Sequence, residues 1–472
     1  MASNNKTAPQ GTALVLGLGK TGIDVARYLA DGHAASVTLY GGLSSKEGPA
    51  VDELRATGVD VVLGTEDIEG SYDFAVVSPG ISERSDFFAH AVAHANEVMG
   101  EPEFAYRVSP ERWLAITGTN GKTTTTALTA SLLVAGGFDA EAVGNIGTLI
   151  TSVLDERRDE EWFVAELSSY QLATTSELHP RAACLLNVTP DHLSWHGSME
   201  AYALAKERAF ANFDERDLAV VSCDDDWCRS CISRLEDRGL RVCHLTTTSD
   251  PNTPCAAFPR DGQLVVRLDG VEHPLVRIEE LSIKGEHNVQ NALAASALAL
   301  EVGVADEAVC KGLIAFQALE HRIEPCGELN RVRFVNDSKA TNTDSVEKAL
   351  TAFVPGSIVL LLGGKDKGTD LTSLMEAAKG TCAAIVCFGA AGQRMEAAAH
   401  DVIGDDGPTI THAAHLEDAL DTGIALAKPG QVVLLSPACA SFDEFSSFEE
   451  RGRVFKRLVA DRIQVAGEVQ SA

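Results

Sequence analysis

One segment restricts the fold of this chain more than any other, the stretch WLAITGTNGKTTTT at residues 113–126. An apolar strand runs directly into a loop bounded by Gly118 and Gly121, and a lysine and a row of threonines follow. Glycine lets the backbone approach a ligand closely, and the first N–H groups of a helix that opens near Thr123 would face an anion. The segment therefore predicts a phosphate-binding unit of strand, loop and helix.

The loop is shorter than the common P-loop. Where that pattern has its first glycine, this chain has Ile116. Lys122 would place a positive charge beside the phosphates, and the Thr123 hydroxyl can hold a magnesium ion. A plain Gly-rich turn is the structural alternative, but it needs neither the lysine nor the adjacent hydroxyls.

Composition restricts the class of partner and the location. The chain has 472 residues, which is too long for one ordinary core. Its formal net charge of −29 opposes nonspecific binding to nucleic acid and to anionic membranes. No apolar run reaches the roughly 18 residues of a membrane span, and the polar start lacks a signal-peptide core. We expect a cytoplasmic protein with no nucleic-acid partner and no membrane insertion.

The 11 cysteines are irregularly spaced, which favours reduced thiols over a disulfide framework. Cys223, Cys228, Cys231 and Cys243 lie close in sequence to His244, so a zinc or redox site is one interpretation. No second tight pair completes the usual zinc spacing. Buried thiols are therefore the favoured interpretation.

A second Gly-rich turn lies near the start of the chain. The strand TALVL at 12–16 precedes GLGKTG, which has glycines at 17, 19 and 22. An NAD-binding fold would end its next strand with an acidic residue for the ribose, but this chain has Tyr40 there. A nicotinamide cofactor is disfavoured, while the turn Ser78-Pro79-Gly80 follows a strand at the edge where α/β ligands bind.

Apolar strands that end in polar or small residues recur along the rest of the chain. They predict an α/β fold with three domains: a Rossmann-like N-terminal domain (1–100), a central P-loop ATPase-like parallel-sheet domain (101–318) and a Rossmann-like C-terminal domain (319–472). Residues 214–280 are expected to be more irregular and β-rich, with LVVRLDG as a hairpin arm.

Ionisable residues stand at two of the predicted strand ends. Glu166 follows the apolar run WFVA and can complete a magnesium site with Thr123, although a surface carboxylate is the plain alternative. Asp191 and His192 end another strand. A lone histidine is more often structural than a ligand, so this pair gains weight only because it falls at the same sheet edge.

Lys206 lies in a predicted helix, AYALAKERAFANF, on the same face as Tyr202 and Phe210. The plain interpretation is a solvated lysine whose stem covers apolar neighbours. Asn288 and Asn291 share a face of another helix, where their amides suit either a nucleobase edge or helix capping.

These motifs together resemble the Mur ligase family, ATP-dependent enzymes that join amino acids to a UDP-sugar peptide in bacterial cell-wall synthesis. The resemblance covers essentially the whole chain, and its specific segments are GTNGKTTT, GNIG, AELSSYQL, NVTPDHL, AYALAKERAF, GEHNVQNALAA, HRIE and NDSKATN. NDSKATN together with LSPACASFDEF is similar to the branch that adds D-glutamate to UDP-N-acetylmuramoyl-L-alanine. The third-domain strings DNPR and DGAHNP, expected of sister ligases and of folylpolyglutamate synthases, are absent.

The resemblance implies a mechanism. ATP's γ-phosphate is transferred to the alanyl carboxylate, the D-glutamate amine attacks the acyl phosphate, and a tetrahedral intermediate collapses to amide and phosphate. Residues 1–100 would bind the UDP substrate, 101–318 would bind ATP and 319–472 would bind the amino acid. The family pattern also implies a monomer.

The same resemblance gives each site residue a role. Lys122, His192 and Lys206 form the implied catalytic set: Lys122 stabilises the β- and γ-phosphates, His192 binds a second magnesium, and Lys206 matches a lysine that is carbamylated into a metal-binding anion. Thr123 and Glu166 would bind the first magnesium. Nucleotide binding is assigned to Gly118, Thr119, Asn120, Gly121, Lys122, Thr123, Thr124, Asn288, Asn291, Arg322 and Asp337. Substrate binding is assigned to Lys20, Thr21, Ser78, Pro79, Gly80, Asn145, Lys339, Thr341, Lys367, Ser441, Phe442 and Phe448, with Lys367 facing the side-chain carboxylate of D-glutamate.

Two positions depart from the family pattern. Tyr40 stands where members often have an acidic residue near the uridine, and Ser194-Trp195 replace the usual D-R after Leu193. The alternatives are another Mur-type or folylpolyglutamate-type ligase and a non-catalytic ATP-binding regulatory protein. The presence of the full reactive set argues against the last of these.

Overall fold

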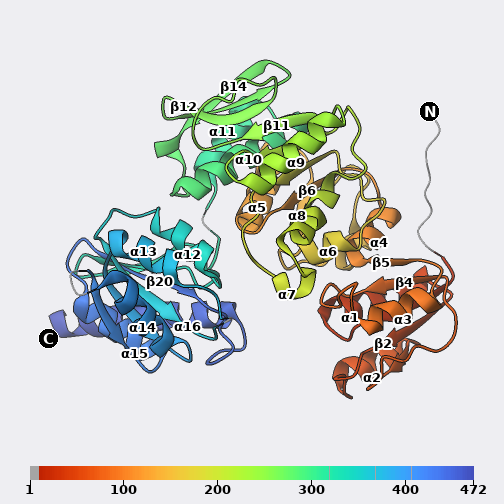
Figure 1. Ribbon diagram of the computed structural model, residues 1–472, viewed down its shortest axis with the longest axis horizontal. Helices are drawn as coiled ribbons and strands as arrows, with labels where there is room; N and C mark the ends of the chain where they lie inside the picture. Colours follow the sequence, from red (N-terminus) through yellow and green to blue (C-terminus); the bar gives the residue numbers. More distant parts are fainter. Residues whose placement is uncertain (1–9, 318, 367, 405–406, 472) are drawn as a thin grey trace. The chain divides into compact units, whose positions relative to one another are not determined.

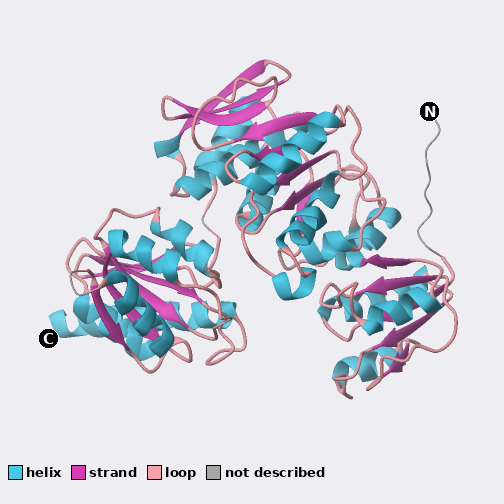
Figure 2. Cartoon of the chain, in the orientation of Figure 1, coloured by secondary structure: helices cyan, strands magenta, loops and turns pink. Residues whose placement is uncertain are grey.

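The computed structural model describes residues 10–317, 319–366, 368–404 and 407–471. In this part of the chain the strands form three sheets, each from its own stretch of sequence (Figures 1 and 2). The chain divides into two compact units, Met1–Leu281 with Val289–Ala315 and Ser282–Asn288 with Phe316–Ala472. None of the described helices combines the length and the apolar composition that crossing a bilayer requires. The three sheets confirm the predicted α/β fold class.

The N-terminal sheet is parallel, with strand order β3-β2-β1-β4-β5. Its strands are β1 (Thr12–Leu16), β2 (Ser36–Tyr40), β3 (Asp60–Val62), β4 (Phe74–Val77) and β5 (Val98–Gly100), and its helices are α1 (Lys20–Tyr28), α2 (Pro49–Ala56) and α3 (Asp86–His94). The direction of winding reverses between β1 and β4, so the carboxyl ends of these two strands flank a crevice where α/β proteins bind ligands.

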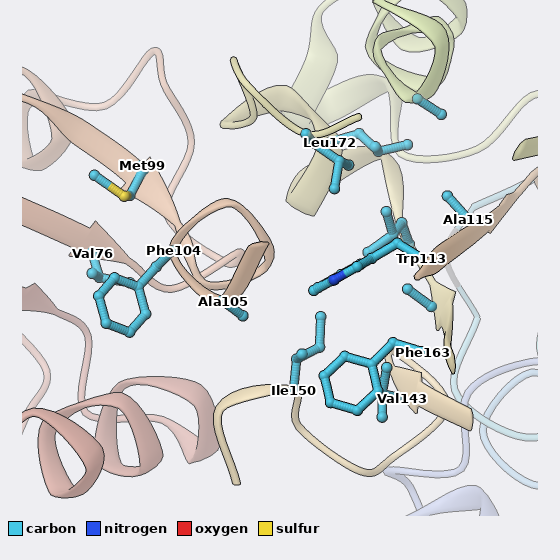
Figure 3. Packing of buried hydrophobic residues seen from close by; sticks show 14 of the residues in the cluster. Val76, Met99, Phe104, Ala105, Trp113, Ala115, Val143, Ile150, Phe163 and Leu172 are labelled. Atoms are coloured by element: carbon cyan, nitrogen blue, oxygen red, sulfur yellow. The ribbon is translucent and has the colours of Figure 1, made fainter. Parts of the chain in front are cut away.

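A shared apolar core joins the N-terminal sheet to the central one. Helix α4 (Glu101–Val108) directly follows β5 and carries Phe104, which packs in one buried cluster with Trp113 and Phe163 of the central sheet. Figure 3 shows Ile150 between these groups. The rings of Trp113 and Phe163 meet edge to face with centroids 5.5 Å apart. The first two sheets therefore belong to one packed unit.

The central sheet has the order β14-β13-β12-β11-β10-β9-β6-β8-β7 and is parallel from β7 to β12. Its strands are β6 (Trp113–Thr117), β7 (Ala140–Gly144), β8 (Trp162–Glu166), β9 (Ala182–Leu185), β10 (Leu218–Ser222), β11 (Arg241–Leu245), β12 (Ala256–Arg260), β13 (Gln263–Leu268) and β14 (Val271–Arg277). Its helices include α5 (Lys122–Ala135), α6 (Ser169–Ala173), α7 (Leu193–His196), α8 (Met199–Glu207), α9 (Asp226–Asp237), α10 (Glu286–Val302) and α11 (Asp306–Ala315), with a 3₁₀ turn η2 (Thr151–Glu156) after β7.

The expectation for residues 214–280 is half right. The hairpin arm is confirmed as β13, which pairs antiparallel with β12 and β14. The first half is wrong, because β10, α9 and β11 extend the parallel sheet as a regular strand, helix and strand. The charged run Asp224–Asp226 suggested an irregular loop, but it contains the residue that caps α9. Asp225 accepts a hydrogen bond from Cys228 N at 2.8 Å.

The C-terminal sheet has the order β15-β16-β20-β17-β18-β19. Its strands are β15 (Glu324–Leu329), β16 (Val332–Asn336), β17 (Ile358–Gly363), β18 (Cys382–Phe388), β19 (Thr409–His412) and β20 (Val432–Ala438), and its helices are α12 (Thr343–Leu350), α13 (Thr372–Thr381), α14 (Gly392–Ile403), α15 (Leu416–Leu426) and α16 (Phe448–Ser471). Neighbouring residues of β17 enter different cores, Leu360 on one face and Leu361 on the other. Both faces of the sheet are therefore covered by helices (Figure 2).

Candidate active site

The phosphate loop joins β6 to α5, and its two glycines shape it. Gly118 has φ 149° and Gly121 has φ 84°. A Cβ on Gly118 would lie 3.0 Å from a neighbouring leucine side chain, and one on Gly121 would lie 2.4 Å from Oδ1 of Asn291. Both positions therefore require glycine, for backbone conformation and for space.

Lys122 is the first residue of α5, and its side chain folds back over the loop. Its Nζ donates hydrogen bonds to the carbonyl oxygens of Gly118 at 3.0 Å and Thr119 at 2.8 Å. Thr123 and Thr124 follow in the first helical turn, and the N–H groups of a first turn point towards the N-terminal end of the helix. A cation and a helix N-terminus thus converge on the loop, which suits phosphate binding.

Asn187, which the sequence interpretation missed, clamps this loop. Its Oδ1 accepts a hydrogen bond from Asn120 N at 2.8 Å, and its Nδ2 donates to Asn120 O at 3.1 Å. Its own carbonyl accepts from Thr119 N at 2.9 Å. The only signal in the sequence was its place at the end of an apolar strand, and the pairing depends on β9 lying beside β6.

Asn291 of α10 also contacts the phosphate loop. Its Oδ1 accepts from the Thr125 hydroxyl at 3.2 Å, and the side chain stands against the space where Gly121 has no Cβ. Asn288 donates from Nδ2 to Lys284 O at 2.8 Å. Asn291 is thus brought to the predicted nucleotide site, while the contact of Asn288 is to the chain just before α10.

Glu166 is the strongest candidate metal ligand. It ends β8, beside the end of β6, and only 1% of the residue is exposed. Its Oε1 accepts a hydrogen bond from Asn145 Nδ2 at 2.7 Å, whereas Oε2 is buried without a hydrogen-bond partner. A buried carboxylate oxygen with a free lone pair is chemically suited to bind a divalent cation, so the environment of Glu166 fits the metal-ligand role predicted for it.

His192 lies at the start of α7 in a left-handed backbone conformation, with φ 55°. Its ring centroid is 4.7 Å from that of Tyr170, and its Nε2 is 3.4 Å from Asp191 Oδ2. Left-handed φ is uncommon outside glycine, so the backbone of His192 is held in a constrained conformation.

Lys206 is buried, which excludes the solvated-lysine interpretation. Tyr202, Lys206 and Phe210 line the inner side of α8 and the turn after it, and Lys206 is 1% exposed. Its Nζ donates to Gly118 O at 2.7 Å and lies 4.5 Å from the Tyr202 ring centroid. Burial, and next the charge of Lys122, hold the pKa of Lys206 well below its ordinary value. The structure therefore places an amine with a lowered pKa directly against the phosphate loop.

The first glycine-rich turn forms a second candidate ligand site. A Cβ on Gly22 would lie 1.8 Å from Gly17 O, and one on Gly17 would lie 2.8 Å from Ser78 Oγ, so the turn packs tightly against the end of β4. Ser78 Oγ is buried without a hydrogen-bond partner. Thr21 lies in the first turn of α1, and Pro79-Gly80 continue the turn after Ser78. These predicted substrate residues meet at the β1/β4 crevice.

Tyr40 has a structural partner. Its hydroxyl accepts a hydrogen bond from Glu69 N at 2.9 Å, and the ring is buried at the end of β2. The absent acidic residue is thus replaced by a residue that fixes the loop before β4.

Two predicted nucleotide residues, Arg322 and Asp337, occur in the C-terminal unit. Asp337 follows β16 and accepts hydrogen bonds from Ser436 Oγ at 2.7 Å and from Ile323 N at 3.2 Å. Burial raises the pKa of Asp337 to about 7. His321 and Ile323, on either side of Arg322, have φ of 65° and 45°, so Arg322 stands in a strained turn.

The predicted glutamate-binding residues are partly brought together in the same unit. Lys339 Nζ lies 3.8 Å from the ring centroid of Phe448. Arg451 is buried and donates to Ser338 Oγ and Ser338 O, both at 2.9 Å, which ties α16 to the NDSKATN segment. Ser441 is buried, whereas Phe442 is 67% exposed, and Thr341 is half-buried just before α12. Lys367 lies outside the described residues.

The cysteine cluster is not a metal site in the described part of the chain. Cys228, Cys231 and Cys243 are buried free thiols, and no group of them brings its sulfurs within ligand distance of one another. Burial raises the pKa of each of these thiols. The interpretation as buried thiols is confirmed for these three cysteines, whereas Cys223 is half-buried.

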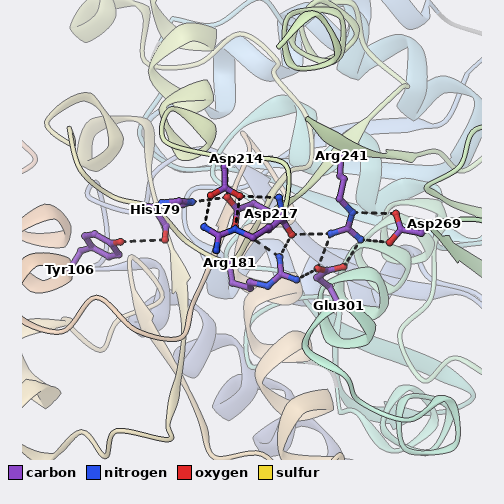
Figure 4. Close-up of polar contacts among 9 residues, drawn as sticks. Tyr106, His179, Arg181, Asp214, Asp217, Arg241, Asp269 and Glu301 are labelled. Carbon is purple, nitrogen blue, oxygen red and sulfur yellow. Dashed lines mark hydrogen bonds and ion pairs between the residues drawn. The ribbon is translucent and has the colours of Figure 1, made fainter. Parts of the chain in front are cut away.

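A charged network lies at the opposite, amino-terminal edge of the central sheet. Figure 4 shows Arg181 and Arg241 beside Glu301, with His179 beside Asp217. The His179–Asp217 hydrogen bond, 2.6 Å long, raises the pKa of His179. These cations already neutralise the carboxylates, so the network joins strand starts to the end of α10.

Three family models match the chain. They are described as "Mur ligase MurD-like, N-terminal domain" over residues 11–100, "Mur ligase middle domain" over 116–299 and "Mur ligase, glutamate ligase domain" over 321–439.

Full-length relatives and solved structures are also similar. The chain is 38% identical over 449 residues to the UDP-N-acetylmuramoylalanine–D-glutamate ligase of Koribacter versatilis, covering 94% of this chain and 96% of the relative. It is 37% identical over 457 residues to the ligase of the same name from Thermoanaerobacter sp., covering 95% and 98%. Its fold is similar to MurF from Acinetobacter baumannii (TM-score 0.61, 19% identity, covering 96% and 93%) and to a pseudomurein peptide ligase type C from Methanothermus fervidus (TM-score 0.59, 15% identity, covering 95% and 99%).

Proposed function

This chain belongs to the Mur ligase family, and from that membership we propose that it is the ATP-dependent ligase that adds D-glutamate to UDP-N-acetylmuramoyl-L-alanine. Relatives similar over nearly their whole length carry this activity in their names. The reaction would serve peptidoglycan precursor synthesis in the cytoplasm. We assign residues 1–100 to the UDP substrate, 101–318 to ATP and 319–472 to the amino acid, in a monomer.

One observation in the structure carries the proposal. Lys122, Glu166 and Lys206 come from three separate elements, and each lies at or beside the carboxyl end of the central sheet. Lys122 and Lys206 donate to the same carbonyl oxygen, Gly118 O. A phosphate loop alone would fit any nucleotide-binding protein, but two lysines and a half-satisfied buried carboxylate beside it fit phosphoryl transfer.

The loop residues Gly118–Thr124 would hold the nucleotide phosphates. Lys122 Nζ now donates to backbone oxygens, and phosphate oxygens would take over these donors. An oxygen of the alanyl carboxylate attacks the γ-phosphorus and ADP leaves, which converts a poor acyl donor into an acyl phosphate. The amine of D-glutamate then attacks the acyl carbon and loses a proton, and phosphate departs. Positioning and charge neutralisation supply most of the rate gain.

Glu166 Oε2 and the Thr123 hydroxyl fit a magnesium ion, which when bound neutralises phosphate charge. We assign a second metal-binding position to His192 and Lys206. The lowered pKa of Lys206 favours the neutral form of its amine, and a neutral amine is the form that reacts with carbon dioxide. A C–N bond forms, the amine loses a proton, and the product is a carbamate anion able to bind metal.

The remaining assignments follow the two outer sheets. We assign the UDP substrate to Lys20, Thr21 and Ser78–Gly80, because the orphaned Ser78 hydroxyl lies against the glycine turn. Asn145 would contact the substrate near the reacting carboxylate. The assigned D-glutamate residues are Lys339, Thr341, Lys367, Ser441, Phe442 and Phe448, and the assigned adenosine residues are Asn288, Asn291, Arg322 and Asp337.

The test is phosphate release from ATP with magnesium, bicarbonate and UDP-N-acetylmuramoyl-L-alanine. Release should require D-glutamate and should not be supported by L-glutamate, L-lysine or meso-diaminopimelate. Folded protein that releases no phosphate with D-glutamate would overturn the proposal. Release with meso-diaminopimelate instead would move the chain to another branch of the family.

A further inference from the structure

The segment from Gly144 to Thr151, here named the bridging loop, contacts both the N-terminal sheet region and the metal-ligand candidate Glu166. It leaves β7 and ends at η2, and an internal turn closed by Gly144 N to Thr148 O at 2.7 Å shapes it. All of its contacts described below lie within one compact unit. The loop therefore links two candidate ligand sites physically.

Helix α1 contacts the bridging loop at two points. Lys20 Nζ donates to Gly147 O at 2.6 Å, and Asp24 Oδ2 accepts from the Thr151 hydroxyl at 2.6 Å. Lys20 and Asp24 are one helical turn apart, so both lie on the same face of α1. The N-terminus of this helix is the glycine turn to which we assign the UDP substrate.

The other end of the loop is attached to Glu166. A Cβ on Gly144 would lie 2.5 Å from Glu166 O, so the ends of β7 and β8 are in close contact there. Asn145 N donates to Glu166 O at 2.9 Å, and Asn145 Nδ2 donates to the carboxylate Oε1 at 2.7 Å. Any displacement of the loop would therefore turn or shift the Glu166 carboxylate.

Thr151 anchors the loop between two carboxylates. Its N–H donates to Oε1 of Glu101 at 2.9 Å, and its hydroxyl lies 3.3 Å from the same oxygen but 2.6 Å from Asp24. A hydroxyl has one proton, and the shorter distance assigns it to Asp24. Glu101 is 1% exposed, and Ile150 is fully buried in the core that Figure 3 shows. The anchor thus cannot move independently of α1 and α4.

We propose that the bridging loop couples the UDP-substrate site to the magnesium–ATP site, with Asp24 and Thr151 as positioning residues. An anion bound at the N-terminus of α1 competes with Gly147 O for the hydrogen bond from Lys20. Loss of that hydrogen bond shifts the bridging loop, and the loop shifts the Glu166 carboxylate through Asn145. By linkage, magnesium–nucleotide must then change the affinity of the UDP substrate by the same factor. The inference rests on the proposed function.

The experiment measures that factor in the full-length protein. Calorimetry gives the dissociation constant of a non-hydrolysable ATP analogue with magnesium, with and without saturating UDP-N-acetylmuramoyl-L-alanine. We expect a ratio of about fivefold or more in the wild type. Thr151→Val keeps the shape and the N–H but removes the hydroxyl, and its ratio should fall to within about twofold of one while each ligand alone binds nearly as before. Thr151→Ser retains the hydroxyl and should retain the ratio.

Asp24→Ala removes the same hydrogen bond from the helix side and should lower the ratio as Thr151→Val does. It also serves as the test if the buried valine of the first variant prevents folding. A folded variant with the wild-type ratio, or a wild type with a ratio of one, would overturn the coupling. If the wild type shows D-glutamate-dependent phosphate release in either case, only the coupling is wrong. If it shows none, the proposed function is wrong and the coupling falls with it.

Discussion

Replacing Lys206 with methionine is expected to abolish ligase activity and to stabilise the fold. The lysine is 1% exposed, and its Nζ donates to Gly118 O at 2.7 Å. Burial and, after it, the charge of Lys122 lower the pKa of this amine, so folding disfavours the protonated form that an unfolded lysine has at pH 8. Burying this amine therefore lowers the free energy of unfolding, and an apolar side chain at the same position would not.

The size of the effect follows from linkage. An unfolded lysine titrates near 10.4, so removing its proton at pH 8 costs about 3 kcal/mol. Methionine avoids that cost but loses one hydrogen bond, worth about 1 kcal/mol. Gly118 O keeps Lys122 Nζ as a donor at 3.0 Å, so no buried acceptor is left unpaired. We expect a net gain of at most about 2 kcal/mol in the free energy of unfolding at pH 8.

The lowered pKa of Lys206 also predicts how the stability of the protein depends on pH. Because the folded pKa is lowered, the unfolded chain binds a proton that the folded chain does not, and wild-type stability rises with pH until the unfolded lysine titrates. Methionine cannot titrate. The advantage of Lys206→Met should therefore shrink as the pH rises from 8 to 9, by at most about 1.4 kcal/mol.

The assay is denaturant unfolding followed by tryptophan fluorescence. All 4 tryptophans lie in the unit that contains Lys206, so the signal reports that unit. Buffers free of carbon dioxide keep the amine unmodified during unfolding. D-glutamate-dependent phosphate release, measured separately with bicarbonate, should fall by at least about a hundredfold.

Lys311→Met is the matched control. Its side chain is 73% exposed and pairs with Glu307 at 2.7 Å across one helical turn. Its stability should stay within about 0.5 kcal/mol of wild type, and its activity should be unchanged. The reasoning is refuted if Lys206→Met is less stable than wild type at pH 8, if its advantage does not change with pH, or if it turns over normally.

Three further outcomes are expected. Glu166→Gln keeps an acceptor for Asn145 but removes the charge, so the magnesium concentration for half-maximal activity should rise at least about tenfold; an unchanged magnesium titration would place the metal elsewhere. Gly121→Ala should weaken nucleotide binding measured by calorimetry, because its Cβ would clash with Asn291. Gly137→Ala is the control, since Gly137 has the same φ of 84° but nothing within 4 Å of an added Cβ. It should leave nucleotide binding unchanged and cost only about 1 kcal/mol of stability through the backbone. Because the pKa of His179 is raised, its pair with Asp217 stabilises the fold fully below the unfolded histidine pKa near 6.5, and this contribution is lost as pH rises through the raised folded pKa. His179→Gln should therefore flatten that part of the curve of stability against pH. An unaltered curve would contradict the assignment.

Local sequence patterns predicted much of the strand framework. The bounds predicted for β1 and the end predicted for β2 match the structure, because short apolar runs ending at glycine or tyrosine leave little freedom in register. The roles of Gly118 and Gly121 were also predictable, since a strand entering a helix through glycines before a lysine permits few conformations. The edge strands β5 and β19 were missed because they have only 3 and 4 residues, too few to show an apolar pattern.

The candidate site was predicted less evenly. The helix spacing placed Lys206, Tyr202 and Phe210 on one face, but spacing alone left open whether that face met solvent or core. Asn187 and Thr151 were missed because each acts on a segment that is adjacent only in the fold. Their residue types, an amide and a threonine, are too common to mark a site.

The sequence by itself determined which segments become strands, where glycine is obligatory, and which charged side chains follow strand ends. Those properties depend on backbone sterics and on apolar periodicity over a few residues. Only the tertiary structure decided that the pKa of Lys206 is lowered, that one oxygen of Glu166 is left without a hydrogen-bond partner, and that α1 contacts the bridging loop. Desolvation, orphaned lone pairs and contacts between distant helices are set by what surrounds a side chain, and that environment exists only once the sheets have packed.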